Sequence, residues 1–120
     1  MNLRNLGAGL NFRGKVKGQI QTYHVFEGDK FFFICSFSRR KRKAGNFNIV
    51  DGEAVRYVHR LVGGKQGITS QDVHRRSRNP RLIGSALEAL NVLYVLVATD
   101  HAKIDRRRQD KQLFFNIKKR

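Results

Sequence analysis

Apolar and polar residues alternate along the amino-terminal part of the chain. A period of two is typical of a β-strand with one buried face. The sequence EGDK between two such runs has the composition of a turn, which indicates a hairpin. We therefore expect an antiparallel β-meander over residues 1–50, with strands at 15–26, 31–38 and 46–50, a turn at 27–30, a basic loop at 39–43 and an irregular lead-in before residue 15.

Beyond Asp51 the apolar residues recur at spacings of three and four, which is typical of helices. Each such segment follows a residue that caps helices, and two of these caps are followed three residues later by an acid. We expect a first helix between Asp51 and Gly63, a second of about two turns from Thr69 that stops before Pro80, and a third over residues 85–99 with a buried stripe of Ala86, Leu87, Leu90, Leu93, Tyr94 and Val97.

The carboxyl-terminal segment returns to a period of two. Apolar residues occupy every second position on both sides of the polar stretch RRRQDK at 106–111. A disordered basic tail has no reason to keep this spacing, whereas a hairpin with one face on a core requires it. The pattern predicts an ordered β-hairpin over residues 102–118 with a basic tip.

Three helices followed by a two-stranded hairpin with a basic tip resemble the winged helix-turn-helix superfamily, over about residues 51–118. A short strand at 67–69 would complete the small sheet of that family. The expected fold class is therefore α+β, with an amino-terminal β-hairpin or meander extension over residues 1–50 and a winged helix-turn-helix-like domain over residues 51–120. The resemblance implies DNA binding, with the third helix in the major groove and the hairpin, or wing, on the backbone or in the minor groove.

The third helix departs from that family in its outward positions. With the predicted stripe buried, these positions are Glu88, Asn91, Val92 and Val95, which include no cation. Only Asn91 has the side chain for a bidentate contact to adenine. Alternatively, Val92 and Val95 make the helix a protein-interaction surface and the protein a homodimer.

The net charge is the most informative feature of the composition. The chain carries 25 Lys and Arg against 9 Asp and Glu, a formal charge of +16. Residues 1–60 hold 12 basic and 4 acidic side chains and residues 61–120 hold 13 and 5, so each half is +8. Such a charge is usually matched by a polyanion, because neutralising phosphates releases counterions. Nucleic acid is therefore the expected partner.

A membrane partner is not expected, because the sequence shows neither a basic amphipathic helix nor an apolar run of about 18 residues. The single cysteine, Cys35, lies in an apolar run and has no partner for a disulfide. No secretory signal is visible at the start of the sequence. These observations predict an intracellular protein of the cytoplasm or nucleoid.

Basic residues gather in three predicted loops, where they would hold phosphates without reading bases. Solvated loops, neutralised in part by acids such as Asp105 and Asp110, are the alternative. We predict a non-enzymatic nucleic-acid-binding protein, with duplex DNA favoured by the resemblance; the alternative is an RNA-binding structural component of a ribonucleoprotein particle, such as a small basic ribosome-associated protein. The predicted contacts are Arg39, Arg40, Lys41, Arg42 and Lys43; Arg75, Arg76, Arg78 and Arg81; Asn91; and Arg106, Arg107, Arg108 and Lys111 on the wing.

Three aromatic residues are candidates for stacking on bases. Tyr23, Phe32 and Phe114 lie opposite the main apolar set of their strands, and exposed rings on a sheet bind single-stranded nucleic acid. Packing in a core or between domains is the role that we expect for them, and stacking on bases is the alternative.

The sequence predicts no metal, no cofactor and no catalysis. The four histidines are scattered and there is one cysteine, so no zinc site is expected. Glu27 and Asp29 are the only close carboxylate pair outside the helix starts, and turn composition explains both.

Overall fold

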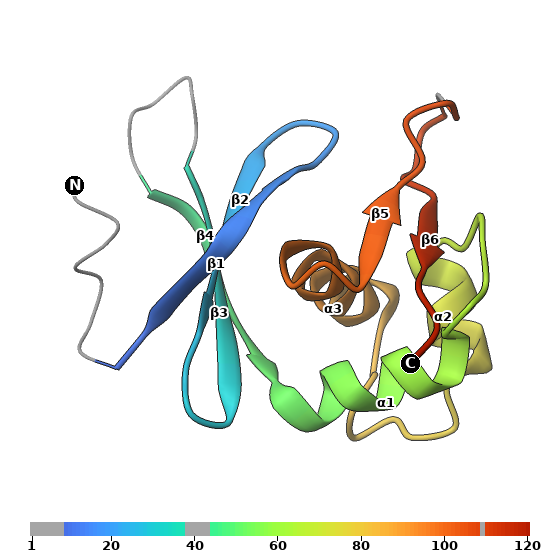
Figure 1. Ribbon diagram of the computed structural model, residues 1–120, viewed down its shortest axis with the longest axis horizontal. Coiled ribbons are helices and arrows are strands. Elements are labelled where there is room, and N and C mark those ends of the chain that lie inside the picture. The colour runs from blue at the N-terminus through green and yellow to red at the C-terminus, as the bar shows by residue number, and fades with distance from the viewer. Residues whose placement is uncertain (1–8, 38–43, 109) are drawn as a thin grey trace.

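The protein has an α+β fold in which a four-stranded antiparallel sheet precedes three helices and a short hairpin (Figure 1). A computed structural model describes residues 9–37, 44–108 and 110–120. No helix in these ranges combines the length and the apolar character needed to cross a membrane. The elements are β1 (Asn11–Lys17), β2 (Thr22–Glu27), β3 (Phe31–Phe37), β4 (Ala44–Asp51), α1 (Gly52–Val62), α2 (Ser70–Arg76), α3 (Ala86–Ala98), β5 (Ala102–Ile104) and β6 (Phe115–Ile117).

The four-stranded sheet is a meander in the order β1-β2-β3-β4. The turn at 27–30 and a strand at 46–50 are confirmed as predicted. The single strand at 15–26 and the irregular lead-in are wrong, because β1 begins at Asn11 and the chain reverses at residues 18–21. The amide of Gly18 donates to the carbonyl of Gln21 at 2.9 Å and closes this turn.

Capping residues set the starts of the three helices. The Asp51 side chain accepts a hydrogen bond from the first turn of α1. Thr69 and Asp72 form a reciprocal capping box at α2. The Ser85 side chain accepts from the amide of Glu88 at α3. These contacts confirm the predicted helix starts, because each cap satisfies amides that the helix leaves without a partner.

The carboxyl-terminal segment forms the predicted pair of strands. β5 pairs antiparallel with β6, and Ile68 adds a single bridge to Phe115 where the short strand was expected. Ala102, Phe115 and Ile117 are buried against the helices. The apolar side of the hairpin therefore anchors its basic connection to the body of the protein.

Helix α3 lies between the four-stranded sheet and the β5–β6 hairpin (Figure 1). The predicted buried stripe is confirmed at Leu93 and Tyr94 but wrong at Leu87, which is 66% exposed. The predicted outward positions are wrong at Asn91, Val92 and Val95, which are all buried. The prediction assumed that only one side of the helix is covered. Since α1, α2 and the hairpin cover one side and the sheet covers another, Val92 and Val95 do not form the exposed surface expected for self-association.

Direct contacts join α3 to the sheet. The Tyr94 ring stacks on Tyr23 of β2 with centroids 4.5 Å apart, and Gly14 of β1 approaches the backbone of Ala98, the last residue of α3. Burial raises the pKa of the Tyr94 hydroxyl. Among the described residues, one apolar core cluster contains side chains of the sheet, the helices and the hairpin, so the predicted parts 1–50 and 51–120 share it.

Candidate nucleic-acid interface

The wing, the connection between β5 and β6, contacts the turn between β1 and β2. Arg106 donates from Nη2 to the backbone carbonyl of Lys17 at 2.8 Å. Gln19 donates from Nε2 to the carbonyl of Asp110 at 3.0 Å. Lys17, Arg106 and Arg108 line the hollow between the two segments. These contacts fix the wing to the amino-terminal sheet.

Two of the wing arginines are held by other groups of the wing. Arg107 donates from Nε and Nη2 to the two oxygens of Asp105 at 2.9 and 3.0 Å. Asp105 is only 8% exposed, and the bonds from Arg107 lower its pKa to about 2. The Arg108 guanidinium lies over the Phe114 ring, 4.6 Å from its centroid. A carboxylate therefore pairs with Arg107, while a neutral ring supports Arg108.

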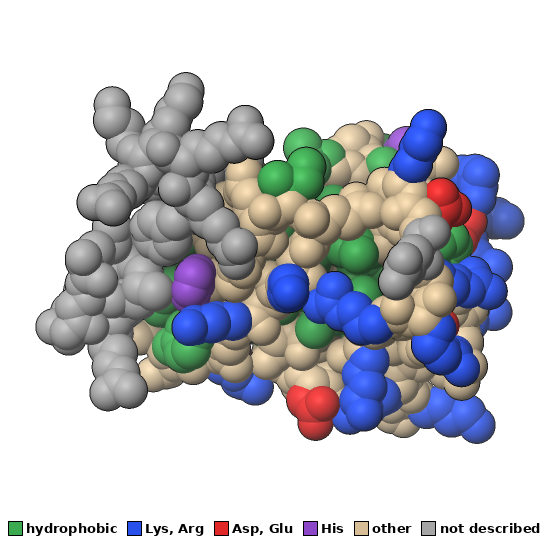
Figure 2. All heavy atoms as spheres, turned by 90° about the horizontal axis from the view of Figure 1, so that it is seen from above, with side chains coloured by type: hydrophobic (Ala, Val, Ile, Leu, Met, Phe, Trp, Pro, Cys, Tyr) green, Lys and Arg blue, Asp and Glu red, His purple; other side chains and the backbone are tan. Residues whose placement is uncertain are grey.

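Four cations around this contact form what we call the wing cluster: Lys17, Arg106, Arg108 and Lys111. None of them forms an ion pair with another residue in the described ranges. Figure 2 shows the side of the molecule on which the β1–β2 turn and the wing lie, with Lys and Arg side chains in a band from its middle to its right edge. Lys and Arg side chains therefore gather on the side of the molecule that carries the wing.

The arginines around Pro80 lie elsewhere. Figure 1 shows the connection from α2 to α3 at the opposite end of the molecule from the wing. Arg75 is paired with Asp72, and the amide of Arg78 donates to the hydroxyl of Tyr57 at 2.9 Å, which anchors the connection. The structure does not bring Arg75, Arg76, Arg78 and Arg81 together with the wing cluster. The predicted contacts at 39–43 lie outside the described residues.

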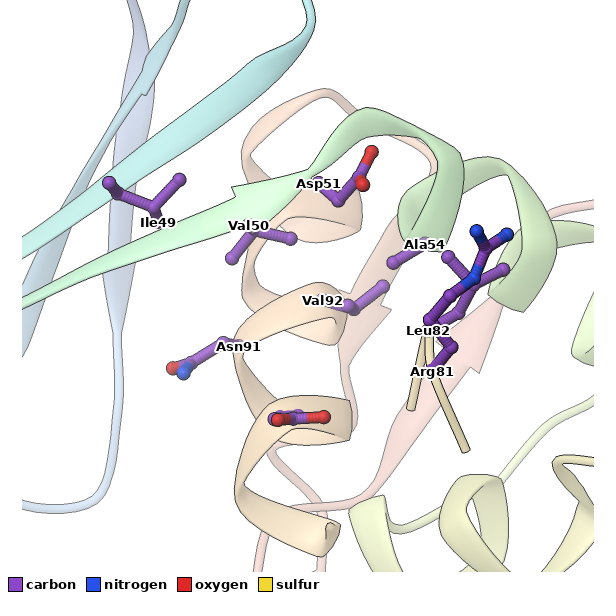
Figure 3. A pocket seen from close by; sticks show the side chains of 9 residues that line it. Ile49, Val50, Asp51, Ala54, Arg81, Leu82, Asn91 and Val92 are labelled. Atoms are coloured by element: carbon purple, nitrogen blue, oxygen red, sulfur yellow. The ribbon is translucent and has the colours of Figure 1, made fainter. Parts of the chain in front are cut away.

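Asn91 does not face outward as predicted. It is 8% exposed and lines a hollow of about 200 Å³ between α3 and β4, together with Arg81, Asp51 and Glu88. Figure 3 shows Asn91 on the α3 side of this hollow. Because the sheet covers this side of α3, the predicted outward placement of Asn91, from which it would contact adenine in a major groove, is wrong.

The aromatic candidates Tyr23 and Phe32 have the packing role that we expected for them. Tyr23 and Phe32 pack against the core, and Phe114 supports Arg108. Among the side chains that the structure describes, the exposed rings of the sheet are Phe12 and Phe47, which the sequence interpretation missed. Alternation was a usable signal for Phe47, which is three residues from the buried Val50 of β4. It was not one for Phe12, because a bulge between Phe12 and Gly14 reverses the side on which β1 places this ring.

Comparison with known proteins does not assign a function to this surface. A comparison with protein-family models, curated proteins and solved structures finds no match. Within the part of the chain that the structure describes, no three His, Cys, Asp or Glu side chains are arranged to hold a metal ion. The molecule is an α+β protein whose wing is fixed to a four-stranded sheet by hydrogen bonds.

Proposed function

We propose that this is an intracellular, non-enzymatic nucleic-acid-binding protein that holds the phosphates of double-stranded DNA with its wing cluster. The observation that supports it is the manner in which the cations are fixed. A backbone carbonyl holds Arg106 and an aromatic ring supports Arg108. Neither contact neutralises the positive charge, so both guanidinium groups remain available to an anion.

Fixed cations favour phosphate binding for two reasons. Less side-chain entropy is lost on binding when the side chain is already ordered. A guanidinium also has five N–H donors, and the bond of Arg106 to Lys17 uses one Nη2–H. Arg107 is a weaker candidate, because Asp105 already accepts two of its donors.

In this proposal, α1 to β6 form a winged-helix arrangement whose third helix does not enter the groove. The side of α3 that would face DNA is covered, because Asn91, Val92 and Val95 are buried and all four strands of the sheet contact this helix. Binding then depends on phosphate contacts by the wing, which position a protein without reading sequence. We expect similar affinity for duplexes of different sequence.

The salt dependence of duplex binding tests the proposal. Each phosphate contact contributes about 0.9 to the slope of log K against log salt concentration on duplex DNA. Replacing Arg106, Arg108 and Lys111 by Ala should therefore reduce the slope by about 2.7. Arg107→Ala is the matched control and should change it by less than about 0.9, because Asp105 pairs with this side chain. Equal slopes for the wild type and the triple variant would overturn the proposal.

RNA is the second candidate partner. The arginines of the α2–α3 connection and the wing lie at opposite ends of the molecule (Figure 1), which suits a folded RNA that surrounds a small structural protein better than it suits a straight duplex. Competition between duplex DNA and a structured RNA at the same salt concentration separates the two. Preferential displacement of the duplex by the RNA would favour the ribonucleoprotein component.

A further inference from the structure

The outer face of the four-stranded sheet has an aromatic layer of its own. Side chains alternate along each strand, and Val16, Val25 and Ile34 point into the shared core. Their neighbours in sequence therefore point to the other side of the sheet. The strand registers place these in two rows across the four strands: Phe12, Phe26, Phe33 and Ile49, and beside them Lys15, His24, Cys35 and Phe47.

The rings of this layer contact one another and remain open to solvent. Phe12 packs on Phe26 with centroids 5.3 Å apart, and Phe33 on Phe47 at 4.9 Å. Phe12 is 46% exposed, Phe47 57% and Ile49 64%, whereas Phe26 at the base of the layer is 2% exposed. Three large exposed apolar side chains on one face exceed the scattered singles that are normal for a surface.

Cations lie on the same side of the sheet. Lys15 is in the second row, and Lys17, two residues further along β1, points the same way and belongs to the wing cluster. Neither forms an ion pair with a described residue. The aromatic layer is therefore bordered by positive charge that continues to the wing.

We infer that this face binds single-stranded nucleic acid, with bases stacked on Phe12 and Phe47 and the backbone along Lys15 and Lys17. The inference rests on the proposed nucleic-acid function and adds a second class of ligand at an adjacent site, which shares Lys17 with the wing cluster. Exposed rings with adjacent cations are the combination that single-strand-binding surfaces use. Charge complementarity favours this occupant over an apolar protein partner, because Lys15 and Lys17 would be desolvated against apolar side chains but neutralised by phosphates.

The test compares an oligothymidylate of about 12 nucleotides with an abasic strand of the same length and charge, by fluorescence anisotropy. Since both strands carry the same phosphates, stacking alone distinguishes them. We expect the wild type to bind the oligothymidylate at least about fivefold more tightly. The double variant Phe12→Leu/Phe47→Leu keeps apolar bulk but removes the rings, and it should lose this difference.

Leu87→Ala is the matched control, because Leu87 is also an exposed apolar residue but lies on α3; it should retain the wild-type preference. A thermal melt verifies that the double variant folds, and Phe47→Leu alone replaces it if the melt is lost. An oligouridylate as a further probe shows whether the face prefers RNA.

Equal binding of the base-bearing and abasic strands by the wild type would overturn the inference, as would full retention of the preference in the double variant. If light scattering shows that the wild type is a dimer and the double variant is a monomer, the face serves self-association instead. The duplex assay keeps the two proposals apart: the double variant should bind duplex DNA like the wild type, and the wing variant should not. If both variants retain duplex binding, the wing proposal is contradicted and the inference about the sheet is not.

Discussion

The substitution Val95→Asp tests the central feature of the fold, the covering of α3 by the sheet. Val95 is fully buried, although the sequence pattern placed it on the outward side of the helix. If the sheet covers this side, the new carboxylate is buried without a partner. If this side were open for binding, the carboxylate would be hydrated and cost little.

The expected loss of stability is large. Removing a fully buried valine forfeits about 1.5 kcal/mol or more of hydrophobic stabilisation, and a buried unpaired charge costs several kcal/mol. Together these amount to about 5 kcal/mol. A chain of 120 residues has a total stability on the order of 6–18 kcal/mol and an unfolding entropy of about 0.25 kcal/mol/K. The melting temperature should therefore fall by about 20 °C.

Thermal unfolding followed by far-ultraviolet circular dichroism measures this shift. Leu87→Asp provides the control, because Leu87 is on the same helix and 66% exposed. An acid in the first turn of a helix is favourable, so this variant should melt within about 2 °C of the wild type. Equal melting temperatures for Val95→Asp and Leu87→Asp would refute the burial of α3 against the sheet.

Two further predictions concern the wing and the β1–β2 turn. The carboxyl of Asp105 has a folded-state pKa of about 2 against an ordinary 3.8, so its stabilisation is present above about pH 4 and is lost as the pH falls through about 2. In urea unfolding, Asp105→Asn should be less stable than the wild type near pH 6, and most of this difference should be gone near pH 2, where the folded-state carboxyl is half protonated. An undiminished difference at about pH 2 contradicts the pairing with Arg107. In Gly18→Ala, the Cβ atom would lie 2.8 Å from the Tyr23 ring and 3.1 Å from the Tyr94 hydroxyl. This variant should lose about 1–3 kcal/mol, and an unchanged melting temperature would exclude the close packing.

Local signals in the sequence were sufficient for the helices and the hairpin. The caps at Asp51, Thr69 and Ser85 depend on residues within three positions of each other, so spacing alone predicts them. The turn at 18–21 was missed because its residues continue the alternation of the strand. Glycine is required at position 18 because a Cβ atom would clash with Tyr23 and Tyr94. Tyr94 is far away in the sequence, so no local pattern reveals this requirement.

The placement of the site depended on contacts between distant segments. No local pattern predicts that Arg106 bonds to Lys17, or that Asn91 faces a hollow beside β4. One overlooked signal did exist, because residues 92–98 are apolar without interruption and a helix that is apolar on all sides is typically buried on all sides. A helix buried on all sides does not offer a binding surface, which leaves the wing and the outer face of the sheet as candidates.

The covering of α3 also makes the sheet an intramolecular competitor of any ligand for that helix. β4 ends at Asp51 and α1 begins at Gly52, so the sheet is covalently connected to the helices and always lies close to α3. Effective concentrations for closely linked segments are on the order of millimolar. A free ligand present at micromolar concentration would need an affinity for α3 about a thousandfold higher than that of the sheet merely to occupy half of the molecules.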